Sequence, residues 1–451
     1  RVALTVALGG FLMGFDASVI SGVVTFIEPE FELTKIELGW AVASLTLTST
    51  FAMMVSGPLS DRLGRRPVLQ VAAVLFAISA VASAVAPNFT TLVAARMLGG
   101  LGVGAALIIA PLYIAEIAPP AIRGRLVSFN QLNIVIGISA AFFTNYAILR
   151  LGQSDLAWAD ALRIGDSSWR WMLGVEALPA VFYFLALLAV PESPRWLVMH
   201  GKDQEARRVL ERVSDSLQAE EDIRAVKASL QTEESVTSVT LRELFRPALR
   251  RVLVIATLVA ILQQITGINS VFFYAPTIFE QSGVGTDASF MQAVLVGLVN
   301  LVFTVLAIVF IDRLGRRPLL IVGLGGIAVC MMLISYGFSS EETNPNLILA
   351  GILGFVASFA FSLGPVMWVL FSELFPNRVR GLAVSFVGLI NSAVSFLVQL
   401  VFPWELENLG NSVTFLIYGS FAIVGLVVVV RLLPETKGKS LEELEAELVR
   451  E

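Results

Sequence analysis

Long apolar runs separated by short polar stretches repeat along the whole chain. About 20 apolar helical residues cross the roughly 30 Å hydrocarbon core of a bilayer, and twelve runs reach that length. They lie near residues 3–25, 38–59, 68–86, 91–114, 126–149, 171–190, 251–275, 290–311, 319–338, 347–371, 382–403 and 413–430. The pattern predicts an all-α integral membrane protein with twelve transmembrane helices.

The seventh run carries a dense set of amide, hydroxyl and aromatic side chains, in the segment QQITGINSVFFYAPTIF. On a helical period Gln263, Phe273 and Tyr274 share one face. Gln264 and Asn269 fall to either side of that face. A straight helix therefore cannot turn all of these side chains to one cavity.

Two residues of this segment are candidate points at which the helix breaks, Gly267 and Pro276. Broken helices at membrane depth are tolerated where they line a water-filled site. The segment is therefore predicted to form a binding site for a polar ligand. The alternative is that its amides only hold neighbouring helices together, as polar side chains in membrane bundles often do.

Composition supports a membrane protein, because 56% of the residues are hydrophobic and 15% are charged. Soluble domains have about half apolar and about a quarter charged residues. If the N-terminus is cytoplasmic, few of the 31 basic residues lie in the outer loops and helix ends. These are Lys35, Arg150, Arg163 and Arg170. Basic residues favour the cytoplasmic side, so both termini are predicted to be cytoplasmic in a multi-pass protein of the cell membrane.

Three charged motifs occur once in each half of the chain. DRLGRRP stands at Asp61 to Pro67 and again at Asp312 to Pro318. EIAPPAIRG at 116–124 is echoed by ELFPNRVRG at 373–381, and PES at 191–193 by PET at 434–436. With six spans in each half, the halves are parallel, related by an axis along the membrane normal, with the ligand expected between them near the midplane.

The repeat also sets the predicted boundaries. The N-terminal six-helix half covers residues 1–190 and the C-terminal half residues 251–433. Between them, residues 191–250 carry interleaved acids and bases at helical spacings, which predicts a cytoplasmic helical linker and not a nucleic-acid site. Residues 434–451 form a cytoplasmic tail, with a short amphipathic helix expected from Ser440.

The repeated motifs place arginines and carboxylates together on the cytoplasmic side, where they are expected to form a gate. Guanidinium groups favour paired contacts with carboxylates, and each pair is expected to hold only while that side is closed. The alternative is that these charges only fix topology. The predicted gate consists of Arg62, Arg65, Arg66, Glu116, Arg123, Glu192, Asp312, Arg316, Arg317, Glu373, Arg380 and Glu435.

Three ionisable residues lie within the apolar runs: Asp16 in the first, Arg96 in the fourth and Glu176 in the sixth. Unpaired charges at such depth cost several kcal/mol, so Asp16 and Arg96 are expected to form an ion pair. Protonation of Asp16 would break that pair and couple proton binding to conformation. Glu176 is a second candidate proton carrier, and a purely structural ion pair is the alternative.

Taken together, these motifs resemble the sugar porter family of the major facilitator superfamily over nearly the whole chain. They are DRLGRRP twice, PESPRWL at 191–197, QQITGIN at 263–269, GPVMW at 364–368 and PETKGKSL at 434–441. The chain is similar to bacterial proton-linked sugar symporters and to the human facilitative glucose transporters. The resemblance implies the major facilitator fold and alternating access, and Asp16 stands where proton-linked members carry Asp.

By position, the resemblance implies a monosaccharide, a hexose or a pentose, as the substrate. The implied sugar contacts are Gln131, Gln263, Gln264, Asn269, Asn300, Trp368 and Asn391. Amides that both donate and accept, with an aromatic face against the C–H side of a sugar, suit this ligand. The chain departs from the family pattern at Phe273, Ile138 and Ser392, so the resemblance does not fix which sugar is bound.

The expected function is proton-coupled sugar transport by a monomer in the lipid bilayer. The alternatives are a passive sugar uniporter and a sugar receptor that does not transport. No enzyme is expected, because the chain has neither an intact GxxxxGK[ST] loop nor a cluster of Cys and His. No cofactor is expected, and no metal site, since the chain has one Cys and one His. No nucleic-acid partner is expected, since the acids and bases of the polar region are interleaved.

Overall fold

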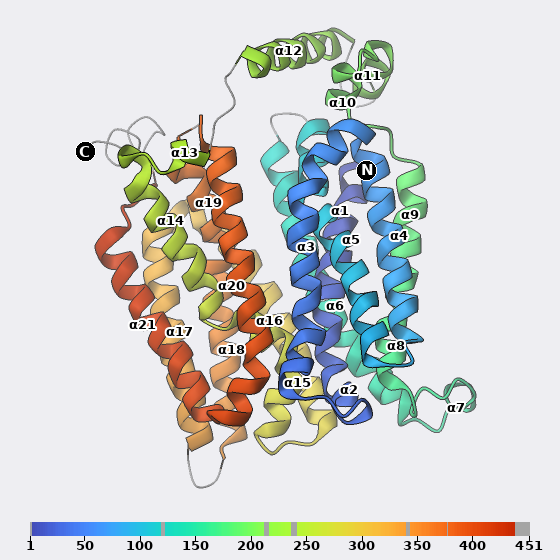
Figure 1. Cartoon of the computed structure of the whole chain (residues 1–451), viewed down its shortest axis with the longest axis vertical. Helices are drawn as coiled ribbons and strands as arrows, with labels where there is room; N and C mark the ends of the chain where they lie inside the picture. Colours follow the sequence, from blue (N-terminus) through green and yellow to red (C-terminus); the bar gives the residue numbers. More distant parts are fainter. Residues whose placement is uncertain are drawn as a thin grey trace. The chain divides into compact units, whose positions relative to one another are not determined.

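The computed structural model describes residues 2–118, 122–211, 216–235, 241–339, 343–376 and 378–437, and these are almost entirely helical (Figure 1). The first part of the chain contains α1 (Val2–Val19), the 3₁₀ helix η1 (Ile20–Gly22), α2 (Val24–Glu30), α3 (Lys35–Leu63), α4 (Arg65–Ala84), α5 (Phe89–Ile117), α6 (Arg123–Gly152), α7 (Ala157–Ala161), α8 (Ser168–Gly174) and α9 (Ala177–Leu188).

Four helices follow in the polar region: α10 (Pro194–Met199), α11 (Asp203–Leu210), α12 (Ser216–Ser235) and α13 (Leu241–Leu244). The remainder contains α14 (Pro247–Ile265), α15 (Ile268–Gln281), α16 (Thr286–Leu314), α17 (Arg316–Ser339), α18 (Pro345–Phe361), α19 (Leu363–Leu374), α20 (Arg380–Asn408) and α21 (Asn411–Leu432). The tail helix expected from Ser440 falls outside the described residues.

Twelve helical segments of the described chain are long and apolar enough to cross a membrane, which confirms the predicted number of spans. The seventh covers Leu249–Gln281 and joins α14 to α15, and the tenth covers Pro345–Leu374 and joins α18 to α19. Several helices begin at residues that the sequence marks as caps. Asn88, for example, accepts a hydrogen bond from the backbone N–H of Thr91 at 2.9 Å, at the start of α5.

The chain groups by contact into two units that do not coincide with the two halves of the repeat. Unit 1 comprises Arg1–Ala17, Leu47–Ile138 and Leu173–Ser238. Unit 2 comprises Ser18–Thr46, Ser139–Met172 and Val239–Glu451. Residues 18–46 and 139–172 therefore pack with helices that come from the second half of the sequence, and the boundaries drawn from the repeat stay a prediction.

Each unit has its own packed helices. In unit 1, α4 packs against α5 and α9. In unit 2, α17 packs against α18 and α21, α14 against α20, and α16 against α18. Large side chains such as Phe76 in unit 1 and Phe355 in unit 2 are fully buried in these cores.

The predicted break in the seventh span is confirmed. Gly267 has φ +87° and ψ 17°, a left-handed conformation that glycine adopts without steric cost, and it separates α14 from α15. Tyr274, two residues before Pro276, also leaves helical geometry, with φ −123° and ψ 18°. The break lets the end of α14 and the start of α15 point side chains to a common place.

Two further interruptions were not predicted. Ser362 separates α18 from α19 with φ −126° and ψ −93°. Glu176 stands at the start of α9, where the sixth span is interrupted after α8. Apolar periodicity does not reveal these breaks, although Gly174 ends α8 and Gly364 and Pro365 follow Ser362.

Candidate functional site

Four amide side chains meet in unit 2 around the break of the seventh span. Gln263 and Gln264 lie in the last turn of α14, Asn269 lies in the first turn of α15, and Asn391 lies on α20. Gln263, Gln264 and Asn391 are 6%, 8% and 6% exposed. Residues from three helices are thus collected into one buried amide cluster, which we define by these four residues.

The amides of the cluster hydrogen-bond to one another. Gln264 Nε2 donates to Gln263 Oε1 and to Asn391 Oδ1, both at 3.2 Å. Asn391 Nδ2 donates to Gln263 Oε1 at 2.8 Å, and Asn269 Nδ2 donates to Gln264 Oε1 at 2.8 Å. Further bonds tie the cluster to backbone carbonyls, from Asn391 Nδ2 to Ala260 at 2.9 Å and from Gln263 Nε2 to Leu363 at 3.2 Å.

A cluster of this kind can exchange its internal hydrogen bonds for bonds to a polyol. Each amide has two N–H donors and a carbonyl oxygen that can accept two hydrogen bonds. The buried amides cannot be left unsatisfied, since each lost bond costs roughly 1–3 kcal/mol. A ligand rich in hydroxyl groups can both donate and accept hydrogen bonds, so it can replace these contacts without leaving an amide group unpaired.

The other residues expected at a sugar site occupy various positions. Asn300 on α16 is buried, at 5% exposed, and Trp368 on α19 is 47% exposed. Neither is hydrogen-bonded to the amide cluster among the described residues. Phe273 is buried, and Tyr274 is buried with its hydroxyl donating to the carbonyl of Gln399 at 3.2 Å. Tyr274 therefore has a structural contact of its own.

Gln131 lies on α6 in unit 1, and its side chain is exposed.

Three residues that the sequence pattern did not single out extend the amide cluster. Ser395 and Gln399 follow Asn391 on α20 at intervals of four residues, and both are buried, at 5% and 1% exposed. Met367 Sδ lies 3.8 Å from Asn391 Nδ2. The spacing 391, 395, 399 is the helical period of a polar face, and that signal was available in the sequence.

Unit 1 contains the predicted intramembrane ion pair, which the structure confirms. Arg96 Nη1 lies 2.7 Å from Asp16 Oδ1 and 3.2 Å from the Asp16 carbonyl. The side chains are 2% and 1% exposed. Gly99 makes room for this contact, because a Cβ atom there would lie 2.7 Å from Asp16 Oδ2 and 2.6 Å from Ser79 Oγ.

The ion pair is incomplete in its hydrogen bonding. Asp16 Oδ2 and Arg96 Nε are buried without hydrogen-bond partners among the described residues. Glu176 is 2% exposed, its Oε1 is likewise without a partner, and it interacts electrostatically with both Asp16 and Arg96. Two carboxyl groups and one guanidinium therefore share a buried site with unused positions for protons.

The first copy of the charged motifs forms a network within unit 1. Arg65 binds Glu116 through two parallel bonds, Nε to Oε2 at 3.0 Å and Nη2 to Oε1 at 2.9 Å, and Arg65 Nη1 donates to Asp61 at 2.8 Å. Glu192 accepts the backbone N–H groups of Arg65 at 3.0 Å and Arg66 at 3.2 Å. Glu192 thus caps the N-terminus of α4. Burial raises the pKa of its carboxyl, and these backbone hydrogen bonds oppose that rise.

The second copy repeats this network within unit 2. Arg316 binds Glu373 through Nε at 3.1 Å and Nη2 at 2.7 Å. Glu435 accepts the backbone N–H groups of Arg316 and Arg317, both at 3.1 Å, at the start of α17. Thr436 Oγ1 donates to Glu373 at 2.6 Å.

The glycine of DRLGRRP allows this arrangement in both copies. Gly64 has φ +105° and Gly315 has φ +91°, and a Cβ atom at either would lie within 2.8 Å of the capping carboxylate. The networks therefore join helices of one unit and fix their ends.

The remaining gate residues are placed as follows. Arg62 is exposed at the end of α3. Arg380 Nε donates to the carbonyl of Phe375 at 3.2 Å. The side chains of Arg123 and Asp312 are outside the described part of the structure. A gate that opens and closes stays a prediction.

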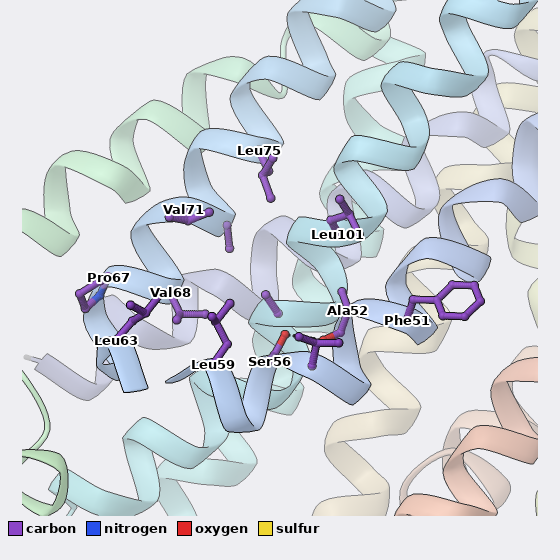
Figure 2. A pocket seen from close by; sticks show the side chains of 13 residues that line it. Phe51, Ala52, Ser56, Leu59, Leu63, Pro67, Val68, Val71, Leu75 and Leu101 are labelled. Atoms are coloured by element: carbon purple, nitrogen blue, oxygen red, sulfur yellow. Dashed lines mark hydrogen bonds between the residues drawn. The ribbon is translucent and has the colours of Figure 1, made fainter. Parts of the chain in front are cut away.

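An apolar cavity of about 420 Å³ lies elsewhere in unit 1, between α3, α4 and α5 (Figure 2). Aliphatic and aromatic side chains such as Phe51, Leu59, Val71 and Leu101 line it. The hydroxyl of Ser56 is already donated to the carbonyl of Ala52. A polyol would lose hydrogen bonds to water there without replacement, so the amide cluster is the better candidate for a sugar.

The chain is similar to known sugar transporters over nearly its whole length. The family model "Sugar (and other) transporter" matches residues 2–448. The arabinose-proton symporter of Bacillus subtilis is 39% identical, over 98% of this chain and 94% of that protein.

Solved structures of the Escherichia coli xylose transporter XylE, 35% identical, are also similar. Its inward-open conformation gives a TM-score of 0.84 and covers 99% of both chains. The proton:xylose symporter bound to 6-bromo-6-deoxy-D-glucose gives a TM-score of 0.77, covering 99% of this chain and 98% of that chain. The family consists of transporters and not of enzymes. The chain therefore belongs to the sugar porter family of the major facilitator superfamily, a multi-pass plasma-membrane protein that transports sugar by alternating access.

Proposed function

We propose that this transporter is a symporter that takes up a pentose or hexose with one proton, that the amide cluster binds the sugar, and that Asp16 carries the proton. The observation that supports it best is the pairing of two buried polar sites in one membrane chain. One site has the hydrogen-bonding groups for a polyol, and the other has a buried carboxylate with an unused oxygen.

In this proposal the sugar replaces bonds within the amide cluster. Gln264 and Asn269 are joined by one bond of 2.8 Å across the helix break, so a hydroxyl that enters between them meets a donor and an acceptor together. Trp368, half exposed on α19, offers an aromatic face for the C–H side of the ring. Gln131 and Asn300 are assigned as further contacts through the family resemblance.

The number of coupled protons is proposed from the charges in unit 1. With Asp16 and Glu176 ionised, Arg96 balances one of two negative charges, so the group carries one net negative charge. A buried net charge is costly, and one proton makes the group neutral. Protonation at Asp16 Oδ2 would also weaken the 2.7 Å contact with Arg96, which gives the proton a means of shifting the conformational equilibrium.

The proposed orientation follows from the basic residues. The ends of α4 and α17 that carry the arginine networks face the cytoplasm, together with both termini. The start of α3 and the end of α20 then face outward. We propose that the protein works as a monomer and that the arginine networks are part of an inner gate.

The test is transport by the purified protein in liposomes. A panel of pentoses and hexoses is offered outside with an inward proton gradient, and both sugar uptake and internal pH are recorded. Accumulation of a sugar above its outside concentration, with acidification of the lumen, is the expected result. Equilibration without accumulation and without proton movement would instead mean passive uniport. Sugar binding without uptake would mean a receptor.

A further inference from the structure

We infer that Gln399 is a positioning residue that ties the amide cluster to the contact between α3 and α20, so that a bound sugar favours closure of that contact. This inference rests on the proposed function, which places the sugar among these amides. It assigns a role to a residue that would not itself touch the sugar.

A continuous chain of hydrogen bonds carries the inference. Asn269 Nδ2 donates to Ser395 Oγ at 2.7 Å, and Gln399 Nε2 donates to the same hydroxyl oxygen at 2.8 Å. Thr46 Oγ1 then donates to Gln399 Oε1 at 2.9 Å. The side-chain amide of Gln399 therefore has one end on the cluster's neighbour Ser395 and the other end on α3.

The residues at the two ends of this series of hydrogen bonds are far apart in the sequence but belong to the same unit. Thr46 is the last residue of the segment Ser18–Thr46, which groups with α20 in unit 2. Gln399 is 1% exposed, and its backbone carbonyl accepts the hydroxyl of Tyr274 at 3.2 Å. Its position is thus fixed by α15 as well as by its own helix.

The helices that this bond joins are in close contact along their outer ends. A Cβ atom at Gly39 would lie 2.0 Å from the carbonyl oxygen of Leu400, so the backbones themselves approach there. The rings of Trp40 and Phe396 meet edge to face with centroids 5.7 Å apart. This seam, defined by Gly39, Trp40, Phe396 and Leu400, must part if the outer side opens between α3 and α20.

The direction of the effect follows from the sharing of Ser395 Oγ. This hydroxyl oxygen accepts one hydrogen bond from Asn269 and one from Gln399. Each of these two bonds is weaker than it would be if the other donor were absent. A sugar that accepts both N–H groups of Asn269 Nδ2, the one given to Gln264 and the one given to Ser395, removes one donor from Ser395 Oγ and strengthens the bond from Gln399. The Gln399 carbonyl is then held toward Thr46, which stabilises the closed seam.

The test uses a cysteine reporter at Ala43, one helical turn after Gly39 of the seam. Cys330 is the only cysteine of the chain, so Cys330→Ser gives a clean background. Ala43 is 0% exposed and stands three residues before Thr46 on the same face of α3. In Ala43→Cys, reaction with a membrane-impermeant maleimide reports how often the seam opens. The rate is measured without sugar and with each transported sugar.

Two variants remove the hydrogen bond between Thr46 and Gln399, and a third keeps it. Thr46→Val removes the hydroxyl while keeping the shape, and Gln399→Leu removes the amide. Each should raise the labelling rate without sugar by about two- to twelvefold, the effect of losing one hydrogen bond. The double variant should be no more reactive than either single variant. Thr46→Ser should label like the parent, because it keeps the donor.

With sugar, labelling should slow in the parent and in Thr46→Ser, and this slowing should be largely lost in Thr46→Val. A purely structural role for Thr46 and Gln399 predicts additive effects and an unchanged response to sugar. Additive effects, or parental labelling in both single variants without sugar, would overturn the inference even if the protein accumulates sugar. Failure of proton-driven accumulation with non-additive labelling would refute the proposed function alone.

Discussion

The ion pair in unit 1 gives the sharpest test of proton coupling, through Asp16→Asn. Asparagine keeps the shape of the side chain but removes the charge-assisted bond to Arg96, which is 2.7 Å long in a site that is 1–2% exposed. Arg96 and Glu176 then remain as one positive and one negative group. The group is then neutral without a proton, so neutralisation of a buried charge no longer favours proton binding.

The size of the expected effect follows from the driving force. One pH unit is worth about 1.4 kcal/mol per proton, which supports about tenfold sugar accumulation at equilibrium for one coupled proton. Asp16→Asn should lower this ratio to about one. Sugar binding and exchange between equal pools should survive, since neither requires net proton movement.

The assay is uptake into liposomes with an inward gradient of one pH unit, with the lumenal pH read in the same sample. Glu176→Gln is the matched variant, because it also removes one negative charge from the group but leaves the contact between Asp16 and Arg96. By the same charge argument Glu176→Gln also binds its proton more weakly, but it keeps the Asp16 carboxyl. Its accumulation should therefore return when the pH on both sides is lowered, whereas that of Asp16→Asn should not. Tenfold accumulation by Asp16→Asn would refute the assignment of Asp16.

Three further predictions test other parts of the structure. Gln264→Ala should weaken sugar binding by about five- to 160-fold, which corresponds to roughly 1–3 kcal/mol for its lost bonds, and unchanged affinity in isothermal titration of folded protein would remove Gln264 from the site. Glu116→Gln combined with Glu373→Gln leaves Arg65 and Arg316 without their carboxylates and should increase labelling of inner-side cysteines, whereas equal labelling would leave these residues a topological role. Gly267→Ala should lower thermal stability in detergent, because φ is +87° and the new Cβ would lie 2.4 Å from the Tyr418 ring. Gly325→Ala is the control, since a Cβ atom there meets nothing within 4 Å, and equal melting temperatures of the two variants would contradict the role given to the break.

Much of the architecture could be predicted from the sequence because it depends on local properties. The length of each apolar run fixes the number of spans, and the repeated motifs fix the two-fold organisation. Gly267 and Pro276 marked the broken seventh span, because the backbone conformations that glycine and proline favour do not depend on neighbouring helices. The pairing of Asp16 with Arg96 followed from the free-energy cost of an unpaired charge in the membrane, since two opposite charges at similar depth are far more stable together than apart.

The tertiary structure decided which residues meet across helices. The sequence aligned Glu192 and Glu435 with the arginines but did not show that both cap helix N-termini through backbone N–H groups. It did not predict that residues 18–46 and 139–172 would group with helices of the second half. Nor did it show that Thr46 bonds to Gln399, more than 300 positions away. Such contacts depend on the tilt and rotation of whole helices, which packing against neighbours sets and hydropathy does not record.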